Sequence, residues 1–134
     1  MSTADTLSQK ALANFRSGYN CAQSVLLVLL EHVEPDGKCD LVPKVAAGFG
    51  SGFGGCGSVC GALVGAVMAV GVKYGSNDSD PQKRAKAYEA TRVLYREFER
   101  QQGSVMCSKL KSDRKACGGL VKWAIQAFMA LEKP

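Results

Sequence analysis

Residues 48–65 read GFGSGFGGCGSVCGALVG, a glycine-rich loop that leads directly into an apolar segment. Six of the residues in the loop 48–57 are glycine. The apolar run continues to Val72, and small residues recur along it, which favours a helix over residues 59–74 with Ser58 as its N-cap. Glycine in a helix costs roughly 1 kcal/mol relative to alanine. We therefore expect these glycines to let neighbouring helices, or a second copy of the chain, approach closely.

The rest of the chain predicts further helices around this one. Apolar residues at helical spacing, cap residues and stop signals place them. The expected segments are 5–16, 21–33 after the cap Asn20, a short 42–47, 81–101 after Asp80-Pro81, a short 105–111 after Ser104, and a last helix after Asp113. The helix that begins at Pro81 is expected to bury Ala85, Tyr88, Thr91, Tyr95 and Phe98. The sequence thus predicts an all-α bundle of about five main helices, in one domain over residues 1–134.

Composition narrows the classes of function. The net charge is +5, and Arg92, Arg96 and Arg100 lie on one helix face without interleaved aromatic residues, so we predict no nucleic-acid binding. The longest apolar run, 59–72, is too short to span a bilayer, and the N-terminus lacks a secretory signal. The expected location is the cytoplasm, where thiols stay reduced. Six cysteines therefore call for a role other than a disulfide framework.

The glycine loop also matches the dinucleotide-binding pattern G-x-G-x-x-G at residues 50–55. That pattern requires a strand before it and a βαβ unit around it. The preceding residues, LVPKVAAGF, indicate a helix instead, and no lysine of a phosphate-binding loop is present. We therefore interpret these glycines as positions of positive φ or of close backbone packing.

Four of the six cysteines fall just after predicted helix caps. They are Cys21, Cys60, Cys107 and Cys117. The first turn of a helix offers unpaired backbone N–H groups and a positive dipole end, which favour the thiolate. We expect at least one of Cys21 and Cys60 to have a pKa below the roughly 8.5 of an ordinary thiol.

Other cysteine chemistries fit less well. His32 lies eleven residues after Cys21 on the same predicted helix, about 16 Å away, so the two cannot form a Cys-His pair. Cys-x-x-Cys is absent, which argues against a thioredoxin motif or a zinc ribbon. No pair of carboxylates stands out as a general acid and base. The sequence does not predict an enzyme.

Several segments together resemble a known family. They are GYNCAQSVL, GFGGCGSVCGALVGAVMAVG, a later Cys followed by Ser-Lys-Leu, and CGGLVKWA. These are similar to the C_GCAxxG_C_C family of redox-active proteins, and the resemblance covers residues from about 8 to 130. A related domain occurs in split-Soret cytochromes, where its cysteines are associated with an iron–sulfur cluster. The resemblance implies that Cys21, Cys60, Cys107 and Cys117 are the functional set and that Cys39 and Cys56 lie outside it.

Several functions stay open. In the first, four thiolates hold a [2Fe–2S] cluster for electron transfer to an unidentified redox partner, and Cys56 is a candidate additional ligand. In this hypothesis the backbone N–H groups of the loop and of the helix start face the cofactor; the residues concerned are Gly54, Gly55, Gly57 and Gly61. Alternatively, the same thiols cycle between dithiol and disulfide without metal. The remaining alternatives are a structural zinc site, and an interaction protein, such as a homodimer, with cysteines as core residues.

Overall fold

The computed structural model describes residues 2–37, 40–110 and 114–133, and the prediction of an all-α fold is confirmed. In chain order the elements are α1 (Thr3–Arg16), α2 (Cys21–Val33), α3 (Val42–Ala46), the 3-10 helix η1 (Ala47–Phe49), α4 (Gly50–Phe53), α5 (Gly61–Tyr74), α6 (Pro81–Gln102), the 3-10 helix η2 (Cys107–Lys109) and α7 (Arg114–Leu131). The described ranges hold no strand, only an isolated antiparallel bridge between Val59 and Met106. None of the helices in these ranges combines the length and apolarity that a bilayer span requires.

Local capping explains where three of the longer helices begin. The Asn20 side chain accepts from the N–H of Gln23 at 2.9 Å, and the Gln23 side chain accepts from the N–H of Asn20 at 3.0 Å, which is a capping box. Asp80 accepts from the N–H groups of Gln82 and Lys83, so α6 starts at Pro81 as predicted. A second capping box, between Ser2 and Asp5, starts α1 two residues earlier than expected. The predicted cap Asp113 lies outside the described residues.

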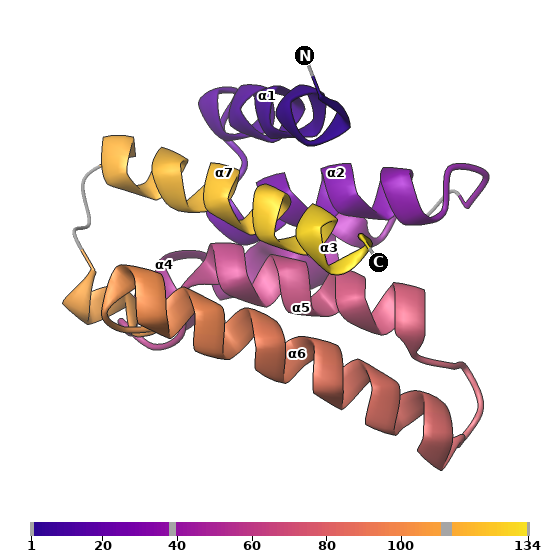
Figure 1. The fold of residues 1–134 in the computed structure, drawn as a ribbon. Coiled ribbons are helices and arrows are strands. Elements are labelled where there is room, and N and C mark those ends of the chain that lie inside the picture. Colours follow the sequence, from indigo (N-terminus) through magenta and orange to yellow (C-terminus); the bar gives the residue numbers. More distant parts are fainter. Residues whose placement is uncertain (1, 38–39, 111–113, 134) are drawn as a thin grey trace.

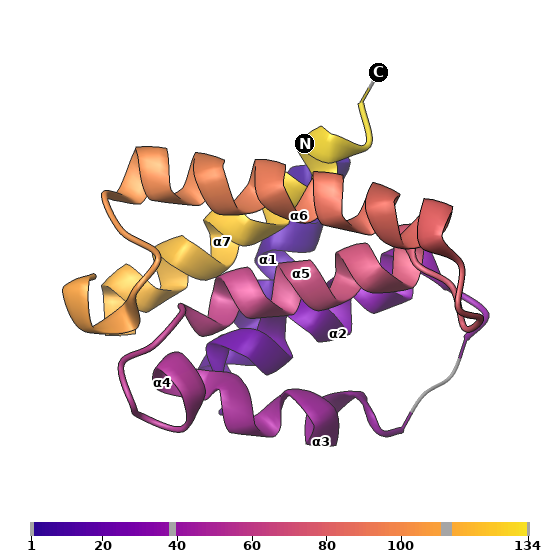
Figure 2. The same cartoon turned by 90° about the horizontal axis from the view of Figure 1, so that it is seen from below.

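The central helix α5 packs most extensively on α2. Figure 1 shows α5 between α6 on one side and α2 and α7 on the other, with α1 outermost. A Cβ atom on Gly65 would lie 2.8 Å from the carbonyl oxygen of Ala22 and 3.1 Å from the Cβ atom of Val25. The small residues of α5 therefore set how closely the two helix backbones approach. Seen from below, α3 and α4 run along the edge of the bundle opposite α6 (Figure 2).

The start of α5 differs from the prediction. The helix begins at Gly61, and Cys60 occupies the cap position in place of Ser58. The reason is that residues 57–60 are hydrogen-bonded to residues 105–108, a long-range pairing that includes the antiparallel bridge at Val59. The same pairing shortens the helix predicted at 105–111 to the three residues of η2.

The predicted buried side of α6 is confirmed at Phe98, and Thr91 is half-buried, but the prediction is wrong for Ala85, Tyr88 and Tyr95, which are exposed. Tyr88 and Tyr95 are 58% and 40% exposed, and the fully buried residues are Leu94 and Phe98. Ala87 and Ala90 pack against the core beside them. Because alanines occupy these inner positions of α6, the helix approaches α5 closely there and its tyrosines face solvent.

Candidate functional site

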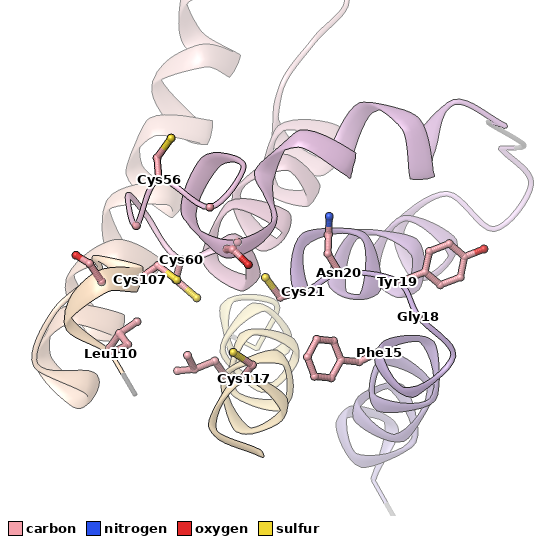
Figure 3. Close-up of a pocket in the computed structure, with 16 residues that line it drawn as sticks. Phe15, Gly18, Tyr19, Asn20, Cys21, Cys56, Cys60, Cys107, Leu110 and Cys117 are labelled. Carbon is pink, nitrogen blue, oxygen red and sulfur yellow. The ribbon is translucent and has the colours of Figure 1, made fainter. Parts of the chain in front are cut away.

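Cysteines from four separate segments line one cavity of about 720 Å³ at one end of the bundle (Figure 3). Cys21 is the first residue of α2, Cys60 caps α5, Cys107 opens η2, and Cys117 lies in the first turn of α7. Cys56 also lines this cavity. The apolar part of the wall comes from Phe15, Leu110 and Leu120. The structure thus brings together the four predicted site cysteines, which lie far apart in sequence.

The antiparallel bridge holds Cys60 and Cys107 beside each other. The N–H of Cys60 donates to the carbonyl of Val105 at 2.8 Å, and the N–H of Cys107 donates to the carbonyl of Ser58 at 2.6 Å. Both cysteines therefore flank the pair Val59–Met106 on the same face of the bridge, where diagonal side chains are within reach of each other. The start of α5 and the start of η2 are fixed by one set of backbone hydrogen bonds.

Cys21 reaches the cavity because residue 61 has no side chain. A Cβ atom on Gly61 would lie 2.5 Å from the sulfur of Cys21 and 2.9 Å from the carbonyl oxygen of Phe49. The adjacent cap Asn20 also donates through Nδ2 to the carbonyl of Ala47 at 2.9 Å, which ties the start of α2 to η1. The position of Cys21 thus depends on a glycine of α5 and on an asparagine that anchors the turn before the glycine loop.

The glycines of the loop act through conformation. Four of them have positive φ, as predicted: Gly52, Gly54, Gly55 and Gly57. A Cβ atom on Gly52 would lie 2.8 Å from the Cβ atom of Cys107, so the absence of a side chain at residue 52 allows η2 to pack against the loop. The N–H groups of Gly54, Gly55 and Gly57 donate to the carbonyls of Gly50 or Ser51 within the loop. Their predicted role in binding a cofactor stays a prediction.

Two residues of the loop carry strain that the sequence did not signal. Ser51 and Phe53 also have positive φ, at 55° and 65°. This conformation is costly for residues with a side chain, and such strain is concentrated at functional sites in many proteins. The T-shaped contact of the Phe53 ring with Phe49, with centroids 5.0 Å apart, supports the turn.

The thiols differ in burial, and burial decides their ionisation. Cys60 is only 3% exposed, whereas Cys21, Cys107 and Cys117 are half-buried and Cys56 is exposed. Burial raises the pKa of the Cys60 thiol to about 11, and the nearby Cys21 and Cys107 thiols add to this rise. The backbone N–H groups of Leu63 and Ala62 oppose the rise, although the Cys60 side chain forms no capping hydrogen bond. Burial likewise raises the pKa of Cys107. At Cys60, desolvation therefore outweighs the effect of the helix start, so this thiol is not the one with the lowered pKa that the sequence predicted for Cys21 or Cys60.

Comparison with known proteins identifies the chain. The family model described as "Putative redox-active protein (C_GCAxxG_C_C)" matches residues 19–131. The chain belongs to the C_GCAxxG_C_C family. No match was found among curated proteins or among solved structures.

The geometry gives a physical reason for the spacing in the C_GCAxxG_C_C motif. In this chain the motif segment is Cys60-Gly61-Ala62-Leu63-Val64-Gly65. Gly61 makes room for the sulfur of Cys21, and Gly65, one turn later on the same face of α5, makes room for the backbone of α2. Ala62 is fully buried between them and the core. The motif therefore allows α5 and α2 to cross closely, with the Cys21 sulfur beside Gly61 and near Cys60.

The two remaining cysteines have different places. The side chain of Cys56 points away from the other four in Figure 3, although its loop lines the cavity. Cys39 lies outside the described residues. Among the residues that the structure does describe, no three His, Cys, Asp or Glu side chains are spaced to hold a single metal ion.

Proposed function

We propose that Cys21, Cys60, Cys107 and Cys117 form one redox site that binds a [2Fe–2S] cluster and serves electron transfer. The observation that carries the proposal is that these four thiols, from four different segments, line one cavity whose wall is partly apolar. Four sulfur donors are the usual ligand set of such a cluster. Such a cluster, when bound, accepts and donates single electrons.

A preformed structural zinc site is not found among the described residues. Zinc needs four ligands at about 2.3 Å from one centre, and a preformed zinc site would show its thiols gathered around one point. The described residues contain no such group. Ligands to a cluster of two iron ions are spread over a longer site than the ligands of one zinc ion, so this absence counts less against a cluster.

The residues of the chain have distinct tasks in this proposal. The bridge between residues 57–60 and 105–108 fixes Cys60 and Cys107, and the Asn20 capping box fixes Cys21. The N–H groups of Leu63 and Ala62 lie near the Cys60 sulfur and favour its thiolate form once a cation is present to offset the burial. The side chains of Phe15, Leu110 and Leu120 limit the access of water.

A dithiol–disulfide cycle is the second candidate, favoured by the pairing of the segments that carry Cys60 and Cys107 across the isolated bridge. In this cycle two thiols lose two electrons and two protons to form one disulfide, and an external disulfide takes them up as two thiols.

Analysis of the freshly, anaerobically purified protein separates these functions. The cluster predicts about two iron and two sulfide ions per chain, with a visible absorption band. Serine variants at Cys21, Cys60, Cys107 and Cys117 should each lose most of the iron. Cys56→Ser is the matched control and should retain it, because its side chain points away.

Other results would support the alternatives. About one zinc ion per chain, with no iron, indicates a structural site. A metal-free protein that forms a Cys60–Cys107 disulfide on mild oxidation indicates the dithiol cycle. A metal-free protein in which none of these thiols reacts refutes a redox site and leaves the cysteines as core residues.

A further inference from the structure

A second groove adjoins the cysteine cavity. It has a volume of about 540 Å³ and lies between η2 and α7. Leu110 and Leu120 line both the groove and the cysteine cavity, so the two spaces adjoin at these side chains. A molecule seated in the groove would extend over Leu110 and Leu120 toward the thiols.

The lining of the groove combines cations with hydrogen-bond donors. Lys109 and Lys122 are exposed along it, and Gln102, Gln126 and Trp123 supply amide and indole surface. None of the described residues in its wall is acidic. Within the described ranges neither lysine forms an ion pair, so both are available to an anion.

The indole of Trp123 has a fixed orientation in this wall. Its Nε1 donates to Gln101 Oε1 at 2.6 Å, and its ring makes a T-shaped contact with Phe98, with centroids 5.1 Å apart. The ring is therefore a rigid surface beside the two lysines. It is also the only tryptophan of the chain, which makes its fluorescence a specific probe of the groove.

The charge of the chain is concentrated in the segment that builds the groove. Residues 92–122 contain eight Lys or Arg and three Asp or Glu, a net charge of +5. The remaining residues contain nine of each sign and are neutral overall. The entire excess positive charge thus belongs to the part of the sequence that includes η2 and the first half of α7. Such a charge distribution raises the local concentration of anions.

We propose that this groove binds the carboxylate or phosphate group of an anionic small molecule whose redox-active end reaches the cysteine cavity. Lys109 and Lys122 hold the anionic group, the glutamine amides and the Trp123 ring orient it, and Leu110 and Leu120 guide the rest of the molecule to the thiols. This inference rests on the cysteines as the place of reaction but not on which group they hold.

Two aromatic disulfides test the proposal on reduced, metal-free protein. One is 5,5′-dithiobis(2-nitrobenzoate), which carries two carboxylates, and the other is the uncharged 4,4′-dithiodipyridine. In both cases a protein thiolate attacks the disulfide, forms a mixed disulfide and releases one aromatic thiolate, while the thiol proton goes to solvent. The absorbance of the released product gives the rate. Iron and sulfide content is measured separately, so a failure of the cluster proposal does not affect this test.

Lys109→Gln with Lys122→Gln removes the cations of the groove. Lys83→Gln with Lys86→Gln is the matched control, because these exposed lysines lie near the opposite end of α6. We expect the groove variant to react about fivefold more slowly with the dianion and at an unchanged rate with the uncharged reagent. Added salt should slow the reaction of the wild-type protein with the dianion but not the reaction of the groove variant.

Fluorescence of Trp123 gives a second, equilibrium readout. Titration with inorganic pyrophosphate should change it in a saturable way in the wild type and in the control pair, but not in the groove variant. Equal slowing of both reagents, equal effects of the two lysine pairs, or thiols that react with neither reagent would each overturn the proposal.

Discussion

Substitution of Gly61 by alanine tests how the helix crossing places the first cysteine. The new Cβ atom would lie 2.5 Å from the Cys21 sulfur and 2.9 Å from the Phe49 carbonyl oxygen. Ordinary contact requires the sulfur to retreat by about 1 Å and the oxygen by about half that. The sulfur can move by rotating its side chain, but the carbonyl belongs to the backbone of η1. We therefore expect Cys21 to leave the cavity.

The energetic cost follows from the same distances. Inserting a methyl group into a close-packed contact costs about 1–3 kcal/mol, and alanine recovers at most about 1 kcal/mol of helix propensity. Gly61→Ala should lower the free energy of unfolding by about 1–2 kcal/mol in urea titrations, and the folded variant should bind less metal. Two glycines of α5 serve as controls.

A Cβ atom on Gly71 would meet no atom of a neighbouring element within 4 Å, so Gly71→Ala should stabilise the protein by about 0.5–1 kcal/mol. Gly65→Ala should destabilise it through the Ala22 carbonyl without touching a sulfur atom, and its folded form should keep its metal content. If Gly61→Ala matches the wild type in both stability and metal content, or if Gly65→Ala loses metal equally, the assigned role of Gly61 is wrong.

Two further predictions concern ionisation and capping. Because burial raises the pKa of Cys60 from 9.0 to about 11, the Cys60 thiol keeps its proton in the folded metal-free protein at pH values at which it loses the proton in the unfolded chain. The Cys60 thiol alone should therefore lower stability by about 2–3 kcal/mol as the pH rises from 9 to 11. Cys60→Ala should remove most of this slope in urea titrations and leave a smaller part from Cys107, whose pKa burial also raises; a slope of unchanged size contradicts the assignment. Asp80→Ala should cost about 1 kcal/mol by removing the cap of α6, with unchanged metal content because this cap lies at the opposite end of α6 from η2; a loss of metal would contradict that separation.

Local signals in the sequence were enough to place the main helices. Asn20 and the Asp80-Pro81 pair mark helix starts through side chains that bond to the next turn, and both predictions are confirmed. The small residues of α5 likewise predicted a buried helix, because only a close crossing compensates for several helical glycines. These features depend on residues within four positions of each other.

Features that depend on distant residues were missed. The non-helical conformation of residues 57–60 follows from pairing with residues 105–108, so the sequence near Ser58 could not reveal that Cys60 is the cap. The exposure of Tyr88 depends on how closely two alanines let α6 approach. The gathering of four cysteines was expected from the family resemblance, whereas their spacing along the chain carried no such information. The groove beside Trp123 had no signal except the clustered positive charge.

The distribution of the four thiols over α2, α5, η2 and α7 has a consequence for biogenesis. During synthesis Cys117 is the last of them to leave the ribosome, and until α7 docks on α1 and α5 the nascent chain presents an incomplete ligand set. If these thiols hold a cofactor, as proposed above, its assembly follows completion of the tertiary structure. A chain that holds the cofactor would then be one that has completed folding.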